Sequence, residues 1–221
     1  MTYDFWPLAG SNEKVPVRNL YAFGWNYPEH NRELGRAADV PIVVFQKSSA
    51  ALIGDGGSVP YPTNTADLQY EGELVVLIGK DGDHIAPERA LDLVWGYAPG
   101  IDFTLRDIQK DAKAKGHPWF FSKNFRAAAA VGAFHLKSAL PNLPDARLTL
   151  SVNGTRRQEA KFREMANDVA ALISRLTENL PLLRGDAIFT GTPAGVGPVK
   201  PGDLVVCTIE GLAPLSVRIT E

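Results

Sequence analysis

The chain has a single cysteine, Cys207, which excludes an internal disulfide and any zinc site built from several cysteines. It has no excess of charge of either sign. The formal net charge is −2, which argues against a nucleic-acid or membrane-surface partner. Its apolar runs are far shorter than the roughly 20 residues that span a bilayer. The first ten residues also lack the basic start and long apolar stretch of a signal peptide. We therefore expect a cytoplasmic protein that binds neither membranes nor nucleic acids.

What is present is the composition of an ordinary globular domain, with 45% hydrophobic and 22% charged residues. A chain of 221 residues fits one domain and buries roughly 70–75% of its unfolded surface. Residues 1–16 carry Pro7, Gly10 and Pro16 and are expected to form an irregular N-terminal lead-in. Residues 17–221 are expected to form a single domain.

Short apolar runs between glycine and proline turns predict most of the secondary structure. The Asn153–Gly154 pair predicts a tight hairpin between two of the strands. The predicted strands are Asn19–Phe23, Ile42–Gln46, Leu74–Ile78, Leu148–Val152, Ala187–Thr190, Leu204–Ile209 and Leu215–Ile219.

Helical spacing is confined to three segments: Glu88–Trp95 after Pro87, Thr104–Lys115 before Gly116, and Asp168–Glu178 with Asn167 as its cap. In the first of these, Leu91 and Val94 or Trp95 are expected to face inward. Strands outnumber helices and do not alternate regularly with them. The pattern therefore predicts a strand-dominated α+β domain with a few short helices.

Two carboxylates stand two residues apart in the segment Tyr70-Glu71-Gly72-Glu73, at the start of a strongly apolar strand. Strand geometry places Glu71 and Glu73 on one face, and Gly72 between them lets a backbone or ligand approach closely. Like charges on one face repel unless a cation lies between them. Hard oxygen ligands of this kind suit Mg²⁺, Mn²⁺ or Ca²⁺ rather than zinc. The alternative is a solvated acidic strand end.

A further acid, Asp102, lies between Ile101 and Phe103, where an extended stretch meets the helix expected near Thr104. It is either another metal ligand or an acid that stabilises the helix N-terminus. Arg106 and Gln109 lie one turn apart on that helix and can face the same pocket, or they are ordinary surface residues.

His30 and Glu33 have the i, i+3 spacing that brings an imidazole and a carboxylate together on one helical turn. A carboxylate that orients a histidine makes a general base able to activate water. A surface ion pair would have the same spacing.

Two further elements carry polar groups of interest. Lys123 is an isolated cation in the aromatic stretch Pro118–Phe125, where it can stabilise a developing enolate. Thr192 lies in the glycine-rich segment 185–197, whose free amides and hydroxyl can bind a carboxylate. A structural turn explains the glycines of this segment, but not a threonine on each side of Gly191.

Together these segments resemble the fumarylacetoacetate hydrolase family. The matching stretches occur in family order from Asn19 onward: G-x-N-Y-x-x-H-x-x-E at 24–33, E-x-E at 71–73, G-I-D-F-T-x-R-D-x-Q at 100–109, G-x-P-W…S-K-x-F at 116–125, V-N-G-x-x-R-Q at 152–158, and G-D-x-I-x-T-G-T-P-x-G-V-G-P at 185–198. The chain departs from the family pattern at Lys47-Ser48, at Ala160 and in the loop Arg126–Ala130.

The resemblance implies a mixed β-sandwich roll and a homodimer. It implies that Glu71, Glu73 and Asp102 bind Mg²⁺ or Mn²⁺, that His30 and Glu33 activate water, and that Lys123 assists at the reacting carbonyl. Arg106, Gln109 and Thr192 are then expected to contact a small 2-oxo acid substrate.

The activity implied is metal-dependent hydrolysis of the C–C bond of an acylpyruvate such as fumarylpyruvate, yielding pyruvate and a carboxylic acid. Oxaloacetate decarboxylation on the same metal site is the first alternative. An isomerase of 2-oxo-dienoates is another, against which the intact dyad argues. A non-catalytic binding module of the same fold is the last, and only the departures at Arg126–Ala130 favour it.

Overall fold

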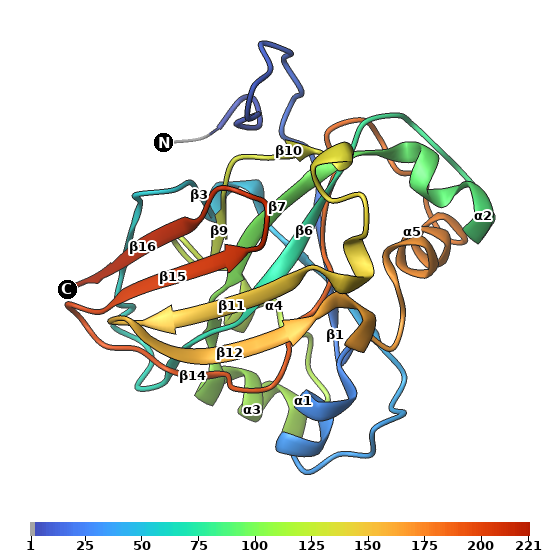
Figure 1. Cartoon of the computed structure of the whole chain (residues 1–221). Coiled ribbons are helices and arrows are strands. Elements are labelled where there is room, and N and C mark those ends of the chain that lie inside the picture. Colours follow the sequence, from blue (N-terminus) through green and yellow to red (C-terminus); the bar gives the residue numbers. More distant parts are fainter. Residues whose placement is uncertain (1–2) are drawn as a thin grey trace.

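A mixed eight-stranded sheet forms the centre of the computed structural model, which describes residues 3–221 (Figure 1). Most neighbouring strands are antiparallel, whereas β1 pairs with β13, and β3 with β9, in parallel. In spatial order this sheet contains β2 (Val43–Lys47), β1 (Leu20–Gly24), β13 (Ala187–Phe189), β6 (Gly72–Ile78), β7 (Val94–Asp102), β9 (Ala129–Val131) and β3 (Leu52–Ile53), with β10 (His135–Leu136) paired to β7.

Two smaller sheets complete the strand layers, and one of them lies in front of β6 and β7 in Figure 1. That five-stranded sheet has the order β12 (Thr155–Lys161), β11 (Arg147–Val152), β15 (Leu204–Ile209), β16 (Leu215–Thr220) and β4 (Ser58–Pro60). The three-stranded sheet contains β14 (Gly197–Pro198), β5 (Leu68–Tyr70) and β8 (Thr104–Leu105). The predicted strand-dominated sandwich roll is confirmed.

Helices are few and short. The α-helices are α1 (Pro28–Glu33), α2 (Pro87–Ala90), α3 (Arg106–Ala114), α4 (Phe120–Lys123) and α5 (Val169–Thr177). Single 3₁₀ turns occur at Ser49–Ala51, Leu91–Leu93, Lys137–Ala139, Leu143–Asp145 and Phe162–Glu164. No helix in residues 3–221 has the length and apolar character needed to cross a membrane.

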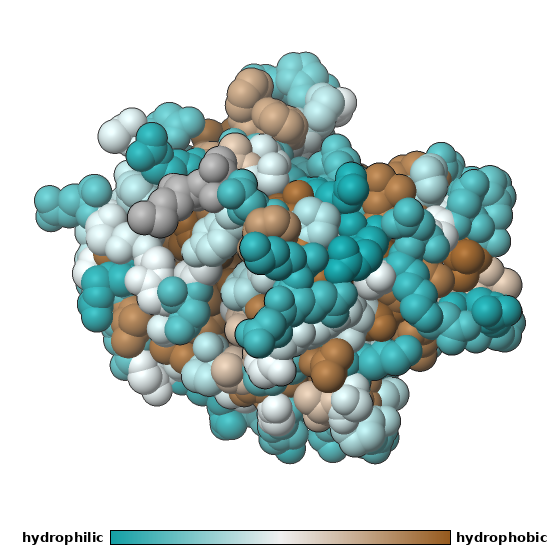
Figure 2. All heavy atoms as spheres, turned by 90° about the horizontal axis from the view of Figure 1, so that it is seen from above, coloured by the Kyte–Doolittle hydropathy of each residue, from teal (hydrophilic) through white to brown (hydrophobic). Residues whose placement is uncertain are grey.

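Hydrophilic residues cover most of the face in Figure 2, with hydrophobic ones dispersed among them.

The main core lies between the large sheet and the five-stranded sheet. Alternate residues of β11 and β15 are buried, as the period of two in a half-covered strand requires. Strand β6 is buried on both faces because a second cluster lies behind it. Trp6 belongs to that cluster, and its indole donates a 2.7 Å hydrogen bond to the carbonyl of Gly185. Within the expected lead-in at 1–16, Trp6 and Val15 thus pack on the sheet, whereas residues 3–5 and 12–14 are exposed, and residues 1 and 2 lie outside the described part of the chain.

The hairpin prediction is confirmed: Asn153 and Gly154 join β11 to β12 with φ values of 52° and 78°. The helix expected over Glu88–Trp95 is wrong in its second half. Helical structure ends at Leu93, and Val94 begins the nine-residue strand β7, which pairs with β6. Leu91, expected inside, is 44% exposed.

Three further expectations need correction. Helix α3 begins at Arg106 instead of Thr104, because Thr104 pairs with β5 as part of β8. Asp168 caps α5 by accepting from the amide of Ala171, in the place expected for Asn167. The 126–130 segment is not a loop throughout, because Ala129 and Ala130 are buried in β9.

Candidate active site

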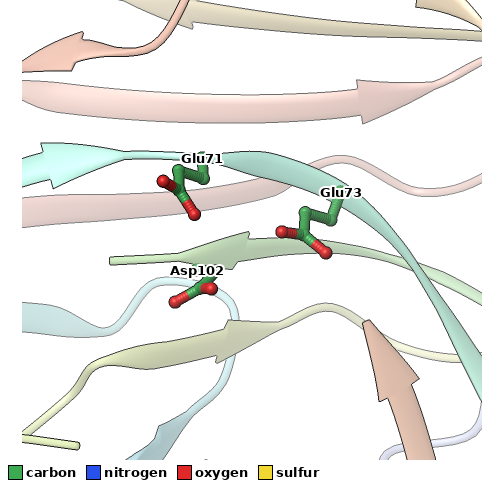
Figure 3. Close-up of side chains that lie close together, drawn as sticks. All are labelled: Glu71, Glu73 and Asp102. Atoms are coloured by element: carbon green, nitrogen blue, oxygen red, sulfur yellow. The ribbon is translucent and has the colours of Figure 1, made fainter. Parts of the chain in front are cut away.

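Three buried carboxylates meet where the antiparallel strands β6 and β7 lie side by side. Glu71 immediately precedes β6, Glu73 lies on it, and Asp102 ends β7. The pairing of Gly72 with Ile101 places Asp102 opposite Glu71, and the Asp102 amide donates a 2.8 Å hydrogen bond to the Glu71 carbonyl. The three side chains point toward one another (Figure 3), and their nearest oxygens lie within 4.8 Å. The predicted juxtaposition of these acids is confirmed.

The negative charges of the three acids are not equally balanced by neighbouring cations. Burial works to raise the pKa of Glu71, but the cations of Lys123 and Arg106 outweigh it and hold that pKa below its ordinary range. Burial raises the pKa of Glu73 well above its usual value, and the neighbouring carboxylates of Asp102 and Glu71 add to the rise. In residues 3–221 no ion pair joins Glu73 to a cation.

Two buried lysines, Lys47 and Lys123, form ion pairs with Glu71 and Asp102 of the acidic triad. Lys123 Nζ lies 2.6 Å from Oε2 of Glu71, 2.6 Å from Oδ2 of Asp102 and 2.7 Å from the hydroxyl of Thr104. Burial lowers the pKa of Lys123, but Asp102 and Glu71 reverse the effect and raise it. Lys47 Nζ lies 2.5 Å from Oδ1 of Asp102. The sequence did not indicate this role for Lys47, which the motifs marked only as part of the departure at Lys47-Ser48.

The donor set fits a divalent cation. It consists of hard carboxylate oxygens, as Mg²⁺ and Mn²⁺ prefer. Glu73 is a buried carboxylate that lacks a positive partner, and burying an unpaired charge is costly. Its one hydrogen bond among the described residues comes from the amide of Gly191, at 2.7 Å. A cation between the three acids would supply the charge that Glu73 lacks.

Gly191 and Gly72 allow the close approaches that this arrangement needs. Gly191 has φ +99°, and a Cβ there would lie 3.0 Å from the Cβ of Asn26. A Cβ on Gly72 would lie 3.1 Å from the side-chain oxygen of Gln158. That oxygen accepts the amide of Gly72 at 2.9 Å. The neighbours at Gly72 are thus the side chains of Gln158 and Leu150, in place of the backbone or ligand that was expected.

His30 and Glu33 form the predicted pair on α1, with 3.0 Å between Nδ1 and Oε2. The other oxygen of Glu33 accepts the amide of Gly195 at 3.0 Å, which ties α1 to the glycine-rich segment. His30 is only 4% exposed. Burial lowers its pKa, although the carboxylates of Glu71 and Glu33 work in the opposite direction. A neutral imidazole is the form that can accept a proton.

Arg106 is held by three partners at the start of α3. It pairs with the carboxylate of Glu71, and its other nitrogens donate to the side-chain oxygens of Gln69 at 2.8 Å and Gln109 at 2.7 Å. Gln109 also accepts from Lys113 at 3.0 Å. The interpretation of Arg106 and Gln109 as ordinary surface residues is therefore wrong, because both belong to a network around Glu71.

The hydroxyl of Thr192 is already engaged by the protein. It donates to the carbonyl of Gly72 at 2.9 Å and accepts from Gln158 at 2.8 Å. Gln158 also donates to the carbonyl of Pro193 at 2.8 Å. Gln158 therefore links the E-x-E strand to the segment that follows β13. The R-Q pair in the sequence marked the residue, although it did not indicate this function.

A buried asparagine fixes the chain just before α1. Asn26 donates to the carbonyls of Thr190 and Asn167 at 2.9 and 3.0 Å, and it accepts from the amide of Asn167 at 2.9 Å. Every polar atom of its side chain is thus bonded. These bonds hold the segment that carries His30 against the end of β13.

Most of the expected residues line one narrow cavity, whereas Asp102 is fully buried and is not part of its lining. Its lining includes His30, Glu71, Glu73, Arg106, Gln109, Lys123 and Thr192, with aromatic walls from Phe23, Trp25, Phe45 and Trp119. The structure therefore brings together nearly all the side chains that the motifs singled out. Glu33 is not part of the lining; it is bonded to His30, and 35% of its side chain is exposed.

Known proteins of similar sequence include two mitochondrial enzymes. The sequence is 38% identical over 202 residues to the mitochondrial oxaloacetate tautomerase of Bos taurus, covering 91% of each chain. It is 38% identical over 196 residues to the mitochondrial oxaloacetate decarboxylase of Dictyostelium discoideum, covering 88% of this chain and 90% of that one.

Among solved structures, fumarylpyruvate hydrolase from Pseudomonas aeruginosa, in complex with Mn²⁺ and pyruvate, superposes with a TM-score of 0.95 at 36% identity. The match covers 100% of this chain and 97% of that one. Residues 19–220 also match the family model described as fumarylacetoacetate (FAA) hydrolase, C-terminal. The chain therefore belongs to the fumarylacetoacetate hydrolase family.

Proposed function

We propose that this protein is a divalent-metal-dependent hydrolase that cleaves an acylpyruvate into pyruvate and a carboxylic acid. The observation that carries the proposal is the His30–Glu33 pair, whose imidazole opens into the same cavity as the Glu71 and Glu73 carboxylates. A general base beside a metal site is the arrangement that attack by water on a carbonyl requires. The similarity to fumarylpyruvate hydrolase supports the same reaction class.

The acidic triad would hold the metal ion. Glu71, Glu73 and Asp102 provide its protein ligands, and Mg²⁺ or Mn²⁺ suits their oxygens. When bound, the ion would polarise the 2-oxo group of the substrate and neutralise negative charge on the departing enolate.

The protein's own residues then account for the proton transfers. Because Nδ1 of His30 faces Glu33, Nε2 is the nitrogen that accepts a proton from water. The hydroxide adds to the acyl carbonyl, and the C–C bond to the pyruvate unit breaks. Its electron pair goes to the pyruvate enolate, and His30 returns the proton to the enolate carbon. Arg106 and Lys123 provide positive charge near the substrate's acidic end.

A second candidate is tautomerisation or decarboxylation of oxaloacetate. The 38% identity to an oxaloacetate tautomerase and to an oxaloacetate decarboxylase favours it. Tautomerisation interconverts the enol and keto forms of oxaloacetate, and decarboxylation releases CO₂ and leaves the pyruvate enolate, which then takes up a proton. Neither reaction needs an attacking water. Tautomerisation needs one group that moves a proton to or from the substrate, a role within the reach of His30.

The experiment is pyruvate release by metal-stripped protein after Mg²⁺ or Mn²⁺ is restored, with fumarylpyruvate, acetylpyruvate and oxaloacetate offered separately. Metal-dependent release from an acylpyruvate is the expected result. Turnover of oxaloacetate alone would replace the hydrolase by the second candidate; released pyruvate reports decarboxylation, and the change in enol absorbance of oxaloacetate reports tautomerisation. The His30→Ala variant separates the chemistries further, since hydrolysis should collapse whereas decarboxylation should partly survive.

The expected homodimer and cytoplasmic location stay predictions. Light scattering of the purified protein measures the first, and cell fractionation measures the second.

A further inference from the structure

An open cleft of about 940 Å³ adjoins the narrow cavity that contains the metal ligands. The two spaces share the side chains of Trp25, Phe45, Lys113, Trp119 and Lys123 in their walls. A substrate whose 2-oxo acid end lies at the triad would therefore extend its other end into this cleft.

The walls of the cleft carry positive charge but no carboxylate. Arg36, Lys113 and Lys123 line it, and the remaining described lining residues are aromatic, aliphatic or neutral polar, with His117 at the side. Lys123 is occupied by Glu71 and Asp102. Across residues 3–221, no ion pair joins Arg36 or Lys113 to an acidic side chain. These two cations are thus available to a ligand.

Arg36 and Lys113 lie on neighbouring indole rings. The guanidinium of Arg36 is 4.2 Å from the ring centre of Trp25, and Lys113 Nζ is 4.7 Å from that of Trp119. The two rings contact each other edge to face, at 5.5 Å between centres. Stacking on an aromatic face holds a cation in place while leaving its other side free. Lys113 is also anchored through its bond to Gln109.

Arg36 and Lys113 line the same cleft, so their positive charges act on one space. Burial is the main cause that lowers the pKa of Lys113 to about 8, and the charges of Arg106 and Arg36 add to it. Like charges in a half-buried site are relieved by an anion between them.

The backbone at Trp25 has an unusual conformation that the surrounding residues must impose. Trp25 has φ 68°, a value that is a true outlier for a bulky side chain and persists only where the surroundings impose it. Next to it, Gly24 has no Cβ, and an added one would lie 3.4 Å from the ring of Trp119 and 2.8 Å from a methyl of Val43. The absent side chain leaves room for Trp119 to pack against Trp25.

We propose that Arg36 and Lys113 bind a carboxylate at the far end of the substrate, so that the acyl group of the preferred acylpyruvate itself ends in an acid. This inference rests on the proposed function and narrows it to a class of 2-oxo dicarboxylates. A neutral acyl group would leave the two cations without a partner. Arg36 and Lys113 therefore determine specificity and take no part in bond cleavage.

The test uses two ligands of equal length, 2-oxoheptanedioate and 2-oxoheptanoate, which differ only in the distal carboxylate. Neither has the second oxo group that C–C hydrolysis requires, so calorimetry with Mn²⁺-loaded protein measures binding without turnover. The diacid should bind about tenfold more tightly, the difference expected for a hydrogen-bonded charge. Arg36→Gln and Lys113→Met should each weaken the diacid severalfold and leave the monoacid within about twofold.

The matched control is Lys110→Met, which removes an exposed lysine from the same helix outside the cleft lining. It should retain the preference for the diacid. Three results would overturn the proposed subsite. They are equal affinity of the protein for the two acids, an equal loss of affinity for both acids in the variants, and no binding of either acid. Pyruvate release from fumarylpyruvate decides the proposed function separately, so the two proposals can fail independently.

Discussion

The ammonium nitrogen of Lys47 lies 2.5 Å from a carboxylate oxygen of Asp102, and both side chains are fully buried. Lys47 ends β2 and Asp102 ends β7, two strands that are not neighbours in the sheet. Lys47 also donates to the backbone carbonyl of Lys123 at 2.7 Å. One lysine thus fixes both a metal-ligand candidate and the segment that carries the second buried cation.

Replacing Lys47 by methionine should destabilise the protein strongly, because Asp102 would lose one of its two buried cationic partners. Breaking a buried pair by removing one member costs about 3–5 kcal/mol. Urea unfolding in the presence of EDTA measures the loss. Lys80→Met, at an exposed position, is the control and should change the free energy of unfolding by less than about 0.5 kcal/mol. A Lys47 variant as stable as this control would show that the pair contributes little.

The Glu73→Gln variant should lose metal-dependent turnover without losing the fold. Glu73 has no cationic partner among the described residues, and burial raises its pKa. Its neutral replacement should therefore leave the melting temperature of metal-free protein unchanged or higher. Unmodified protein should melt at a higher temperature when Mn²⁺ is added, because the ion binds the folded form, whereas the variant should lose most of this shift. Retained metal-dependent activity would remove Glu73 from the ligand set.

The fall in kcat/KM at low pH, the acid limb of the pH–rate profile, should reflect protonation of His30. Burial holds the pKa of His30 below the ordinary histidine value of about 6.5. The base is therefore neutral and active above that pH, and activity should fall only as pH drops below about 6.5. The measurement is kcat/KM against pH at saturating metal, so that protonation of the metal ligands does not contribute. A midpoint above about 7 would contradict the assignment.

Glu33→Gln provides a second test of the same pair. The Glu33 carboxylate works to raise the pKa of His30. Removing its charge should therefore shift the acid limb to lower pH while reducing kcat, because the imidazole loses its orienting partner. A purely structural role for Glu33 would reduce activity without moving the limb.

Gln158→Met should weaken both stability and catalysis. Gln158 is 1% exposed and bonds the amide of Gly72, the hydroxyl of Thr192 and the carbonyl of Pro193. Leaving buried polar groups unsatisfied costs about 1–3 kcal/mol. Urea unfolding should show this loss, and kcat/KM should fall because Gly72 lies between Glu71 and Glu73. Arg157→Met, at the exposed neighbouring position, should have little effect on either quantity.

Local sequence patterns were enough to predict most of the strands and part of the site. Strand β15 has the predicted bounds Leu204–Ile209, since its alternation is regular and turns flank it. The pairing of His30 with Glu33 followed from spacing within one turn. Both features depend only on residues that are close in the sequence, so the sequence was enough to predict them.

Strand β7 was missed because its local pattern is misleading. Pro87 begins a helical turn, and Gly96, Pro99 and Gly100 are typical of a loop. The segment is nevertheless a strand, since β6 on one side, and β9 and β10 on the other, supply its hydrogen bonds. Long-range pairing therefore outweighs local propensity here.

The sequence by itself determined the strand-dominated class, the two-residue spacing of Glu71 and Glu73, and the dyad. Only the tertiary structure decided that Asp102 lies opposite Glu71 and that Lys47 reaches it from another strand. It alone placed Arg36 in the wall of the same cleft as Lys113, which is 77 positions away in the chain. The physical reason is that spacing sets the geometry within a strand or helix, whereas charges brought together from distant elements depend on how the sheets pair and pack.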